Sequence, residues 1–134
     1  MAAYQYKTGL YNVGSFQVSG RPWITGSTTM VAGQEDRIVF PSVTKSIMIV
    51  NDDPGASEDD IYVHFNATGS GNVIAGKHYF NLSSNGLAIT FNVKCREIYV
   101  SNPTTETTGY TIVAELTGIA ADEMPPLAGS GLTD

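Results

Sequence analysis

The sequence has one cysteine, two histidines and few charged residues, and each scarcity excludes a class of protein. The single cysteine, Cys95, allows no disulfide within the chain and no cysteine-based metal site. Charged residues make up 15% of the chain, against roughly 25% in typical soluble domains. Long helices with solvated Lys and Glu faces are therefore not expected. The composition, rich in Gly, Ser, Thr and Asn, favours sheets joined by turns.

Basic residues are also scarce, since seven of them face thirteen acidic ones for a formal net charge of −6. A nucleic-acid-binding protein needs clustered Lys and Arg to displace counterions from phosphates. We therefore expect neither nucleic acid nor an anionic membrane as a partner. No stretch approaches the roughly 18 apolar residues of a membrane span, and the first residues lack an apolar signal-peptide core. These absences predict a protein made in, and kept in or assembled from, a cytoplasm.

Short alternating runs are the main structural signal in the 134 residues, which fit one domain. Apolar residues occupy every second position in Ile61–Phe65, Leu87–Val93 and Tyr110–Leu116, which is typical of strands with one buried and one wetter face. The run Ser46–Val50 is apolar on both faces, so we place it centrally in a sheet. The sequence predicts an all-β fold, an antiparallel β-sandwich of jelly-roll or immunoglobulin-like type.

Two places bear on how the strands connect. The inward positions are odd-numbered through Cys95 but even-numbered at Ile98 and Val100, so Lys94–Glu97 holds a bulge or corner, or two strands meet there. The turn Ser84-Asn85-Gly86 separates the strand-like run Tyr79–Leu82 from Leu87–Val93 and predicts a hairpin.

The two ends differ from the core. We divide the chain into an N-terminal arm or edge segment (1–20), a sandwich core (21–117) and a C-terminal arm (118–134). The first segment is too hydrophobic for a free tail, and the last is rich in Gly and Pro. Trp23 is interpreted either as a packing anchor or as an interface anchor. The residues that we expect to contact partners are Tyr4, Tyr6, Tyr11, Trp23, Met124 and Leu127.

No catalytic, metal-binding or cofactor-binding pattern is evident, and we predict a protein that is not an enzyme. Cys95 is in phase with the apolar set and is expected to be a buried hydrophobe. His64 is expected on the surface or on a sheet face, and neither it nor His78 belongs to a ligand pair. The Gly-rich loop near Gly69 lacks the Lys and helix of a phosphate-binding loop. An acidic group is interpreted as a solvated loop rather than a Ca²⁺ site; it consists of Asp52, Asp53, Glu58, Asp59 and Asp60.

Several segments resemble small virion structural proteins of tailed phages, especially marine and cyanobacterial ones. They are Tyr11–Gly26, Phe40–Ile47, Val63–Ile74, Phe91–Tyr99 and Gly129–Asp134. The resemblance spans nearly the whole chain and implies a virion component of the capsid decoration or cement type. The implied partners are the major capsid protein or other virion proteins, together with further copies of this chain in a homo-oligomer.

The resemblance leaves the position in the virion open. The first expectation is a decoration protein whose arms lie across neighbouring capsid proteins, where each arm adds a strand to an exposed sheet edge. A neck, tail or baseplate component is the alternative within the structural class. A second class is a glycan-binding module on the virion surface, with Trp23 or an exposed Tyr as the stacking platform and Asp or Asn as polar partners.

Overall fold

The computed structural model describes residues 20–53, 59–67, 78–83 and 85–125, and within them the chain forms eight strands and one 3₁₀ turn. The strands are β1 Arg21–Met30, β2 Glu35–Val39, β3 Ser42–Asn51, β4 Ile61–His64, β5 Phe80–Leu82, β6 Ala88–Phe91, β7 Glu97–Ser101 and β8 Thr108–Ala120, and the turn is η2 Ala121–Glu123.

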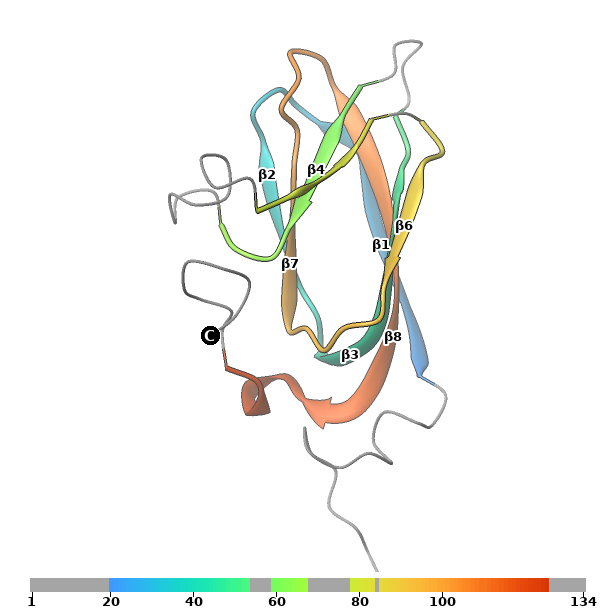
Figure 1. Cartoon of the computed structure of the whole chain (residues 1–134), viewed down its shortest axis with the longest axis vertical. Helices are drawn as coiled ribbons and strands as arrows, with labels where there is room; N and C mark the ends of the chain where they lie inside the picture. The colour runs from blue at the N-terminus through green and yellow to red at the C-terminus, as the bar shows by residue number, and fades with distance from the viewer. Residues whose placement is uncertain (1–19, 54–58, 68–77, 84, 126–134) are drawn as a thin grey trace, which may run out of the picture.

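The strands pair into two four-stranded antiparallel sheets that lie face to face (Figure 1). Sheet A has the order β1-β8-β3-β6 and sheet B the order β2-β7-β4-β5. Every connection changes sheet except that between β4 and β5. This order is that of a jelly roll, a double sheet built from Greek keys. The predicted all-β sandwich is confirmed, and of its two named types the structure has the jelly roll.

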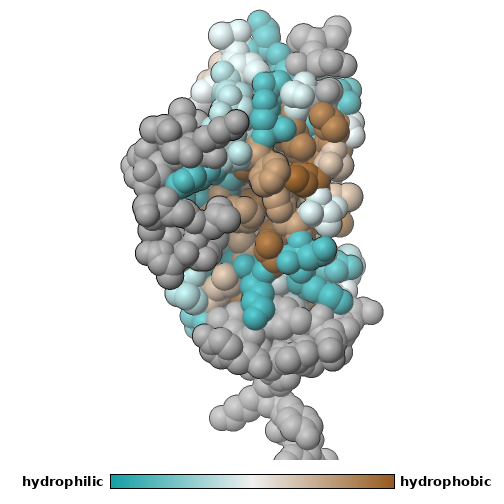
Figure 2. Space-filling view, in the orientation of Figure 1, coloured by the Kyte–Doolittle hydropathy of each residue, from teal (hydrophilic) through white to brown (hydrophobic). Residues whose placement is uncertain are grey.

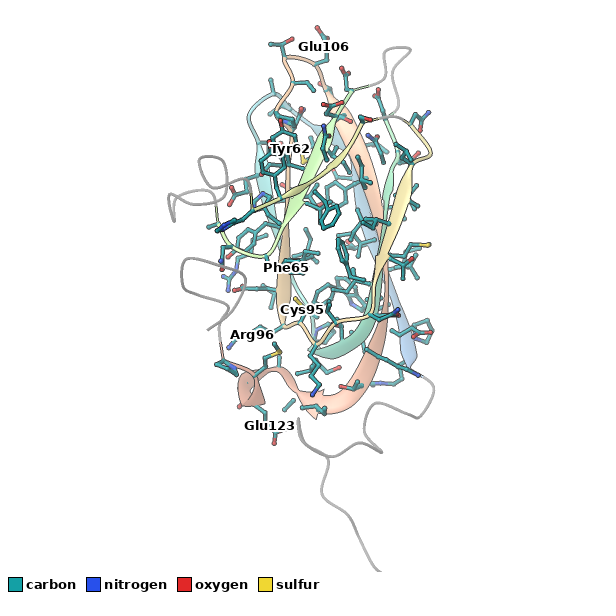
Figure 3. All side chains as sticks on the ribbon, viewed as in Figure 1. Tyr62, Phe65, Cys95, Arg96, Glu106 and Glu123 are labelled. Atoms are coloured by element: carbon teal, nitrogen blue, oxygen red, sulfur yellow. The ribbon has the colours of Figure 1, made fainter. Side chains whose placement is uncertain are left out.

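Side chains of alternate positions fill the space between the sheets (Figure 3). In sheet A one inward row runs across all four strands, from Trp23 through Ala114 and Ile47 to Phe91. Ile47 is fully buried and Ala114 nearly so. β3 lies between β8 and β6, which confirms the central placement of Ser46–Val50. The two-residue period thus sets which side chains build the core.

The chain crosses from sheet A to sheet B between β6 and β7, which explains the change of parity near Cys95. Of the two interpretations, the meeting of two strands is confirmed. The crossing is held by backbone hydrogen bonds from Phe40 N to Arg96 O (2.9 Å) and from Thr44 N to Cys95 O (3.0 Å). The predicted hairpin at Ser84-Asn85-Gly86 is wrong, because β5 and β6 belong to different sheets. The turn chemistry is real, since Gly86 has a φ of 85°, but turn residues do not say which strands pair.

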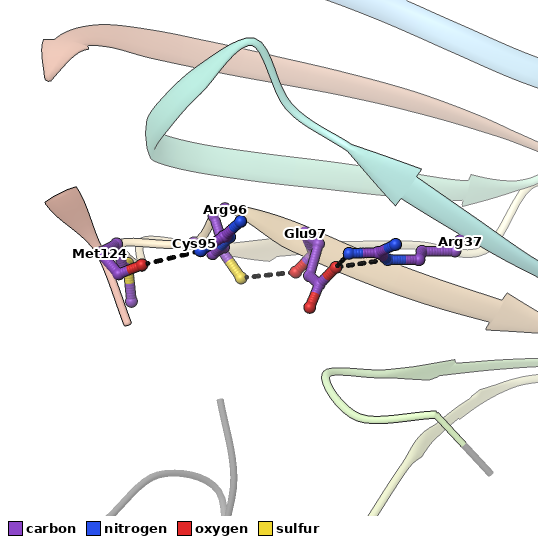
Figure 4. Close-up of polar contacts among 5 residues, drawn as sticks. All are labelled: Arg37, Cys95, Arg96, Glu97 and Met124. Atoms are coloured by element: carbon purple, nitrogen blue, oxygen red, sulfur yellow. Dashed lines mark hydrogen bonds and ion pairs between the residues drawn. The ribbon is translucent and has the colours of Figure 1, made fainter. Parts of the chain in front are cut away.

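The core also extends further than predicted. β8 runs through Ala120, three residues past the expected boundary at 117, and Ile119 is fully buried. The following turn is tied to sheet B by a hydrogen bond from Arg96 Nη1 to the carbonyl of Met124 (3.2 Å), close to an ion pair of Arg37 with Glu97 (Figure 4). The predicted arms lie largely outside the described residues, since they fall in 1–19 and 126–134.

Candidate functional site

An apolar groove opens between the two sheets at the edge formed by β5 and β6. It has a volume of about 470 Å³ and is lined by Val63, Phe65, His78, Tyr79, Phe80, Phe91 and Val93. We call it the edge groove. Figure 2 shows hydrophobic residues gathered on this side of the molecule, between the two layers. Apart from His78 and the hydroxyl of Tyr79, the lining side chains are hydrocarbon, so the groove suits an apolar guest.

Three phenylalanines shape the groove: Phe80 from β5, Phe91 from β6, and Phe65, which directly follows β4. Phe91 meets Phe65 edge to face at 5.5 Å between ring centroids and meets Phe80 in the same manner at 5.2 Å. Phe80 pairs with Val63 across β5 and β4, and it remains 50% exposed. β5 has three residues and β6 has four. Because these edge strands are short, they leave the mouth of the sandwich open where they end.

The outer face of sheet A is nearly free of charge. One outward row passes from Ile24 through Val113 and Met48 to Thr90, in register across four strands. Ile24 is 69% exposed and Met48 36% exposed. We call this surface the neutral face; its residues are Pro22, Ile24, Gly26, Ser46, Met48, Val50, Ala88, Thr90, Thr111, Val113 and Glu115. Its charged member, Glu115, accepts a hydrogen bond from Ser46 Oγ (2.9 Å).

The outer face of sheet B has a different chemistry. Arg37 Nε and Nη2 each lie 2.5 Å from Glu97 Oε2. Tyr62 stacks on Tyr79 with ring centroids 4.0 Å apart and planes at 20°. Close by, Asn81 pairs with Tyr62 across the strands. The two sheets therefore present one polar, aromatic face and one neutral face.

His64 lies on a sheet face, which is one of the two positions expected for it, but it is buried, so the alternative of an exposed surface position is wrong. It points to the outer side of sheet B, where its ring stacks on Tyr99 at 5.7 Å. Its Nδ1 donates to the carbonyl of Asn66 (2.6 Å), and its Nε2 lies 2.6 Å from Ser101 Oγ. Burial lowers the pKa of His64, and the Asn66 carbonyl partly opposes this.

The contact of His64 with Ser101 is a serine–histidine pair that sequence spacing did not reveal, because 37 residues separate the two. Nucleophilic catalysis requires a serine within reach of substrate and a base oriented by a third group. Ser101 and His64 are both buried, and a backbone carbonyl occupies the position of the orienting carboxylate. The pair is placed to satisfy polar atoms within sheet B.

The acidic loop is only partly solvated, which corrects the sequence interpretation. Asp53 is buried and its Oδ2 accepts from Asp59 N (3.2 Å). Buried Asn51 donates from Nδ2 to the carbonyls of Asp59 and Leu82, at 2.8 Å each, and its Oδ1 accepts from Asp53 N. Glu58 lies outside the described residues. Across the described ranges, no group of three or more His, Cys, Asp or Glu side chains is arranged to hold a metal ion.

The other residues singled out in the sequence are placed as follows. Cys95 is buried as predicted; its thiol donates to Glu97 O (3.0 Å), and burial raises its pKa to about 11. Trp23 is half-buried and packs edge to face on Phe40 at 5.2 Å, which favours the packing interpretation. Met124 is half-buried beside Arg96. Tyr4, Tyr6, Tyr11 and Leu127 lie outside the described residues.

Sequence reasoning missed the residues that build the two candidate surfaces. Phe80 and Phe91 belong to runs read as two strands of one hairpin, so their meeting across two sheets was not foreseen. Met48 did carry a signal, because Ser46–Val50 is apolar on both faces. Such a run marks a strand with an apolar outer side as well as a buried one.

The comparisons with known proteins do not assign the chain to a family. No protein-family model matches the chain, and a search of curated proteins returned no match. Within the part of the chain that the structure describes, no helix has the length and apolar character needed to cross a membrane.

Proposed function

We propose that this chain is a non-enzymatic structural protein of a phage virion that decorates the capsid and stabilises it by bridging major capsid proteins. It is made in the host cytoplasm and retained in the particle. The observation that supports this role most directly is the neutral face: a four-stranded surface with an apolar row in register and one charged residue, on a chain with a net charge of −6.

The physical argument is one of electrostatics and area. A surface that lacks charge can approach another protein without leaving buried ions unpaired. β1, β8 and β3 contribute five residues each and β6 contributes three, so at ~3.3 Å per residue and ~4.8 Å between strands the face covers about 300 Å². A stable interface takes about 800 Å² from each partner. The neutral face alone therefore makes a weak contact, and stable attachment requires a second contact or many copies acting together.

The copy number per purified virion tests the proposal. Quantitative mass spectrometry against the major capsid protein should give one copy per capsid subunit or a simple fraction of it. A few dozen copies or fewer would instead assign the chain to the neck, tail or baseplate, which is the alternative within the structural class. Absence from purified particles would overturn both assignments.

A glycan-binding role is a second candidate, and the stacked pair on sheet B is the observation that favours it. Tyr62 and Tyr79 stack beside Asn81, whose Nδ2 donates to Asp60 Oδ2 (3.1 Å). An aromatic platform with a carboxylate and an amide nearby offers a sugar one apolar face and several hydrogen bonds. Glycan-array binding that is lost in Tyr79→Ala would support this function, and the absence of any bound glycan would remove it.

A further inference from the structure

We propose that the edge groove binds apolar side chains from residues 1–19 of a second copy of this chain, so that copies join head to tail. The decoration role proposed above does not account for this groove. The contact proposed here goes beyond that role, since it joins copies of the chain to each other and not to the capsid.

The groove is a receiver for an apolar segment. Its lining combines aliphatic Val63 and Val93 with the rings of Phe65, Phe80 and Phe91. A sugar or phosphate placed there would lose its hydrogen bonds to water and gain few in return. Phe80 is half exposed, and covering apolar surface contributes about 25 cal/mol per Å² removed from water. A guest with aromatic or aliphatic side chains is the one this lining stabilises.

Residues 1–19 have the matching composition. They include four aromatic residues and several aliphatic ones within 19 positions; these are Tyr4, Tyr6, Leu10, Tyr11, Val13, Phe16 and Val18. Their one charged side chain is Lys7. The remaining six basic residues face thirteen acidic ones, so residues 20–134 carry a net charge of −7. The segment is therefore weakly attracted to the body of any copy, whereas two bodies repel each other.

The positions of β1 and β6 at opposite edges of sheet A make a second copy accessible as the receiver. The described chain begins at Gly20, next to β1, which is one edge strand of sheet A. The groove lies beyond β6, the opposite edge strand, and Trp23 and Phe91 mark the two ends of one row. Three strand spacings separate these edges, or about 14 Å. To reach its own groove, the segment must cross the neutral face or pass around the end of the sandwich.

A neighbour that sets its β6 edge beside β1 brings its groove within about one strand spacing, ~5 Å, of the donor edge. Donor and receiver are different surfaces on opposite edges of the same molecule, so the contact is heterologous. Repeated contacts of this kind generate a closed ring or an open chain of copies. A ring would also bring several neutral faces to the capsid at once. Because these contacts act together, their combined affinity would compensate for the small area of each face.

Two full-length variants separate the two halves of the contact. The donor variant replaces Tyr4, Tyr6, Tyr11 and Phe16 by Ser, and the receiver variant is Phe80→Glu. Leu87→Glu serves as the matched control, because Leu87 is 43% exposed and does not line the groove. Light scattering after gel filtration should give an oligomer for the wild type and the control, and a monomer for each of the other two. Circular dichroism confirms that all four are folded.

Mixing the two variants provides the decisive observation. The receiver variant keeps an intact donor segment and the donor variant keeps an intact groove, so an equimolar mixture should form a heterodimer. A wild type that is monomeric at every concentration, or a mixture that stays monomeric, would overturn the proposal.

A synthetic peptide of residues 1–19 tests the groove directly. Its affinity for the donor variant should fall by about tenfold or more when Phe80→Glu is added, and should stay within about twofold when Leu87→Glu is added instead. Equal loss with both additions contradicts the assigned site. Peptide binding together with a monomeric wild type would place the segment in its own groove and refute the second-copy assignment. All of these measurements use the isolated protein, so their failure is distinct from absence of the chain from virions.

Discussion

Phe80 of β5 and Phe91 of β6 meet edge to face with ring centroids 5.2 Å apart, although their strands belong to different sheets. The contact therefore joins the two sheets at the open edge of the sandwich. Phe91 is half-buried and also contacts Phe65, whereas Phe80 is half exposed. The same rings thus help to close the core and form a surface that a partner can cover.

The unequal burial of the two rings predicts unequal effects on stability. Phe91→Ala should lower the free energy of unfolding by about 3 kcal/mol, because it removes two ring contacts and leaves a cavity between the sheets. Phe80→Ala should cost about 1 kcal/mol, since half of that ring is already in water. Urea denaturation of both variants gives the comparison. Equal losses would show that the contact does not hold the edge together as described.

Asn51 should be among the most costly polar residues to replace. Its side chain joins the end of β3 to the backbone of Asp53, Asp59 and Leu82. Asn51→Leu leaves those groups without partners, and we expect a loss of about 3 kcal/mol in the free energy of unfolding. Asn92→Leu, at an exposed position, is the control and should change stability by less than about 0.5 kcal/mol. A similar small change for Asn51→Leu would contradict this role.

The lowered pKa of His64 predicts a loss of stability in mild acid. In the unfolded chain the imidazole takes up a proton as the pH falls below its ordinary pKa of 6.5, whereas the folded chain resists protonation because the ring is buried. The unfolded state then binds more protons, so the free energy of unfolding decreases as the pH is lowered through that range. Well above 6.5 the imidazole is neutral in both states and the contribution is constant.

Comparison with His64→Gln isolates this effect from the carboxylates, including nearby Glu35. Unfolding free energies are measured between about pH 7.5 and about pH 5 for both proteins. The wild type should lose more stability over this range than the variant does. Parallel pH profiles would show that His64 titrates alike in the folded and unfolded chains.

Cys95 should react slowly in the folded protein. Its pKa of about 11, against an ordinary 9.0, leaves about a hundredfold fewer thiolates near neutral pH, and burial also blocks access of the reagent. Modification by a thiol-reactive disulfide should therefore be at least about a hundredfold faster in denaturant than in buffer. A fast native reaction would mean that the crossing between β6 and β7 opens readily.

Met48 tests the neutral face as the docking surface. Met48→Glu adds a charge at the centre of the outward row, next to Val113. Its effect on folding should be below about 1 kcal/mol, because the side chain is already partly in water. Binding of the variant to capsids that lack this protein should fall by about tenfold or more. Leu87→Glu is the control, and full binding by Met48→Glu would assign attachment to another surface.

Much of the fold could be predicted because alternation is local. Leu87–Val93 and Tyr110–Leu116 each show one apolar side, and the structure turns that side inward except at Leu87, which is 43% exposed. The parity change after Cys95 placed a strand junction within a few residues of the true crossing. The buried state of Cys95 followed from the same count. These inferences need only neighbours two positions apart, and the sequence displays those directly.

The sequence by itself determined an acidic, all-β chain with inward and outward faces along each strand, because composition and a two-residue period are properties of the chain alone. Only the tertiary structure decided which strands pair. It separated β5 from β6, brought Ser101 to His64, and aligned Ile24, Val113 and Met48. The physical reason is that pairing, and the covering of an outward face, depend on contacts between distant segments. Their stability rests on packing and hydrogen bonds that no local pattern encodes.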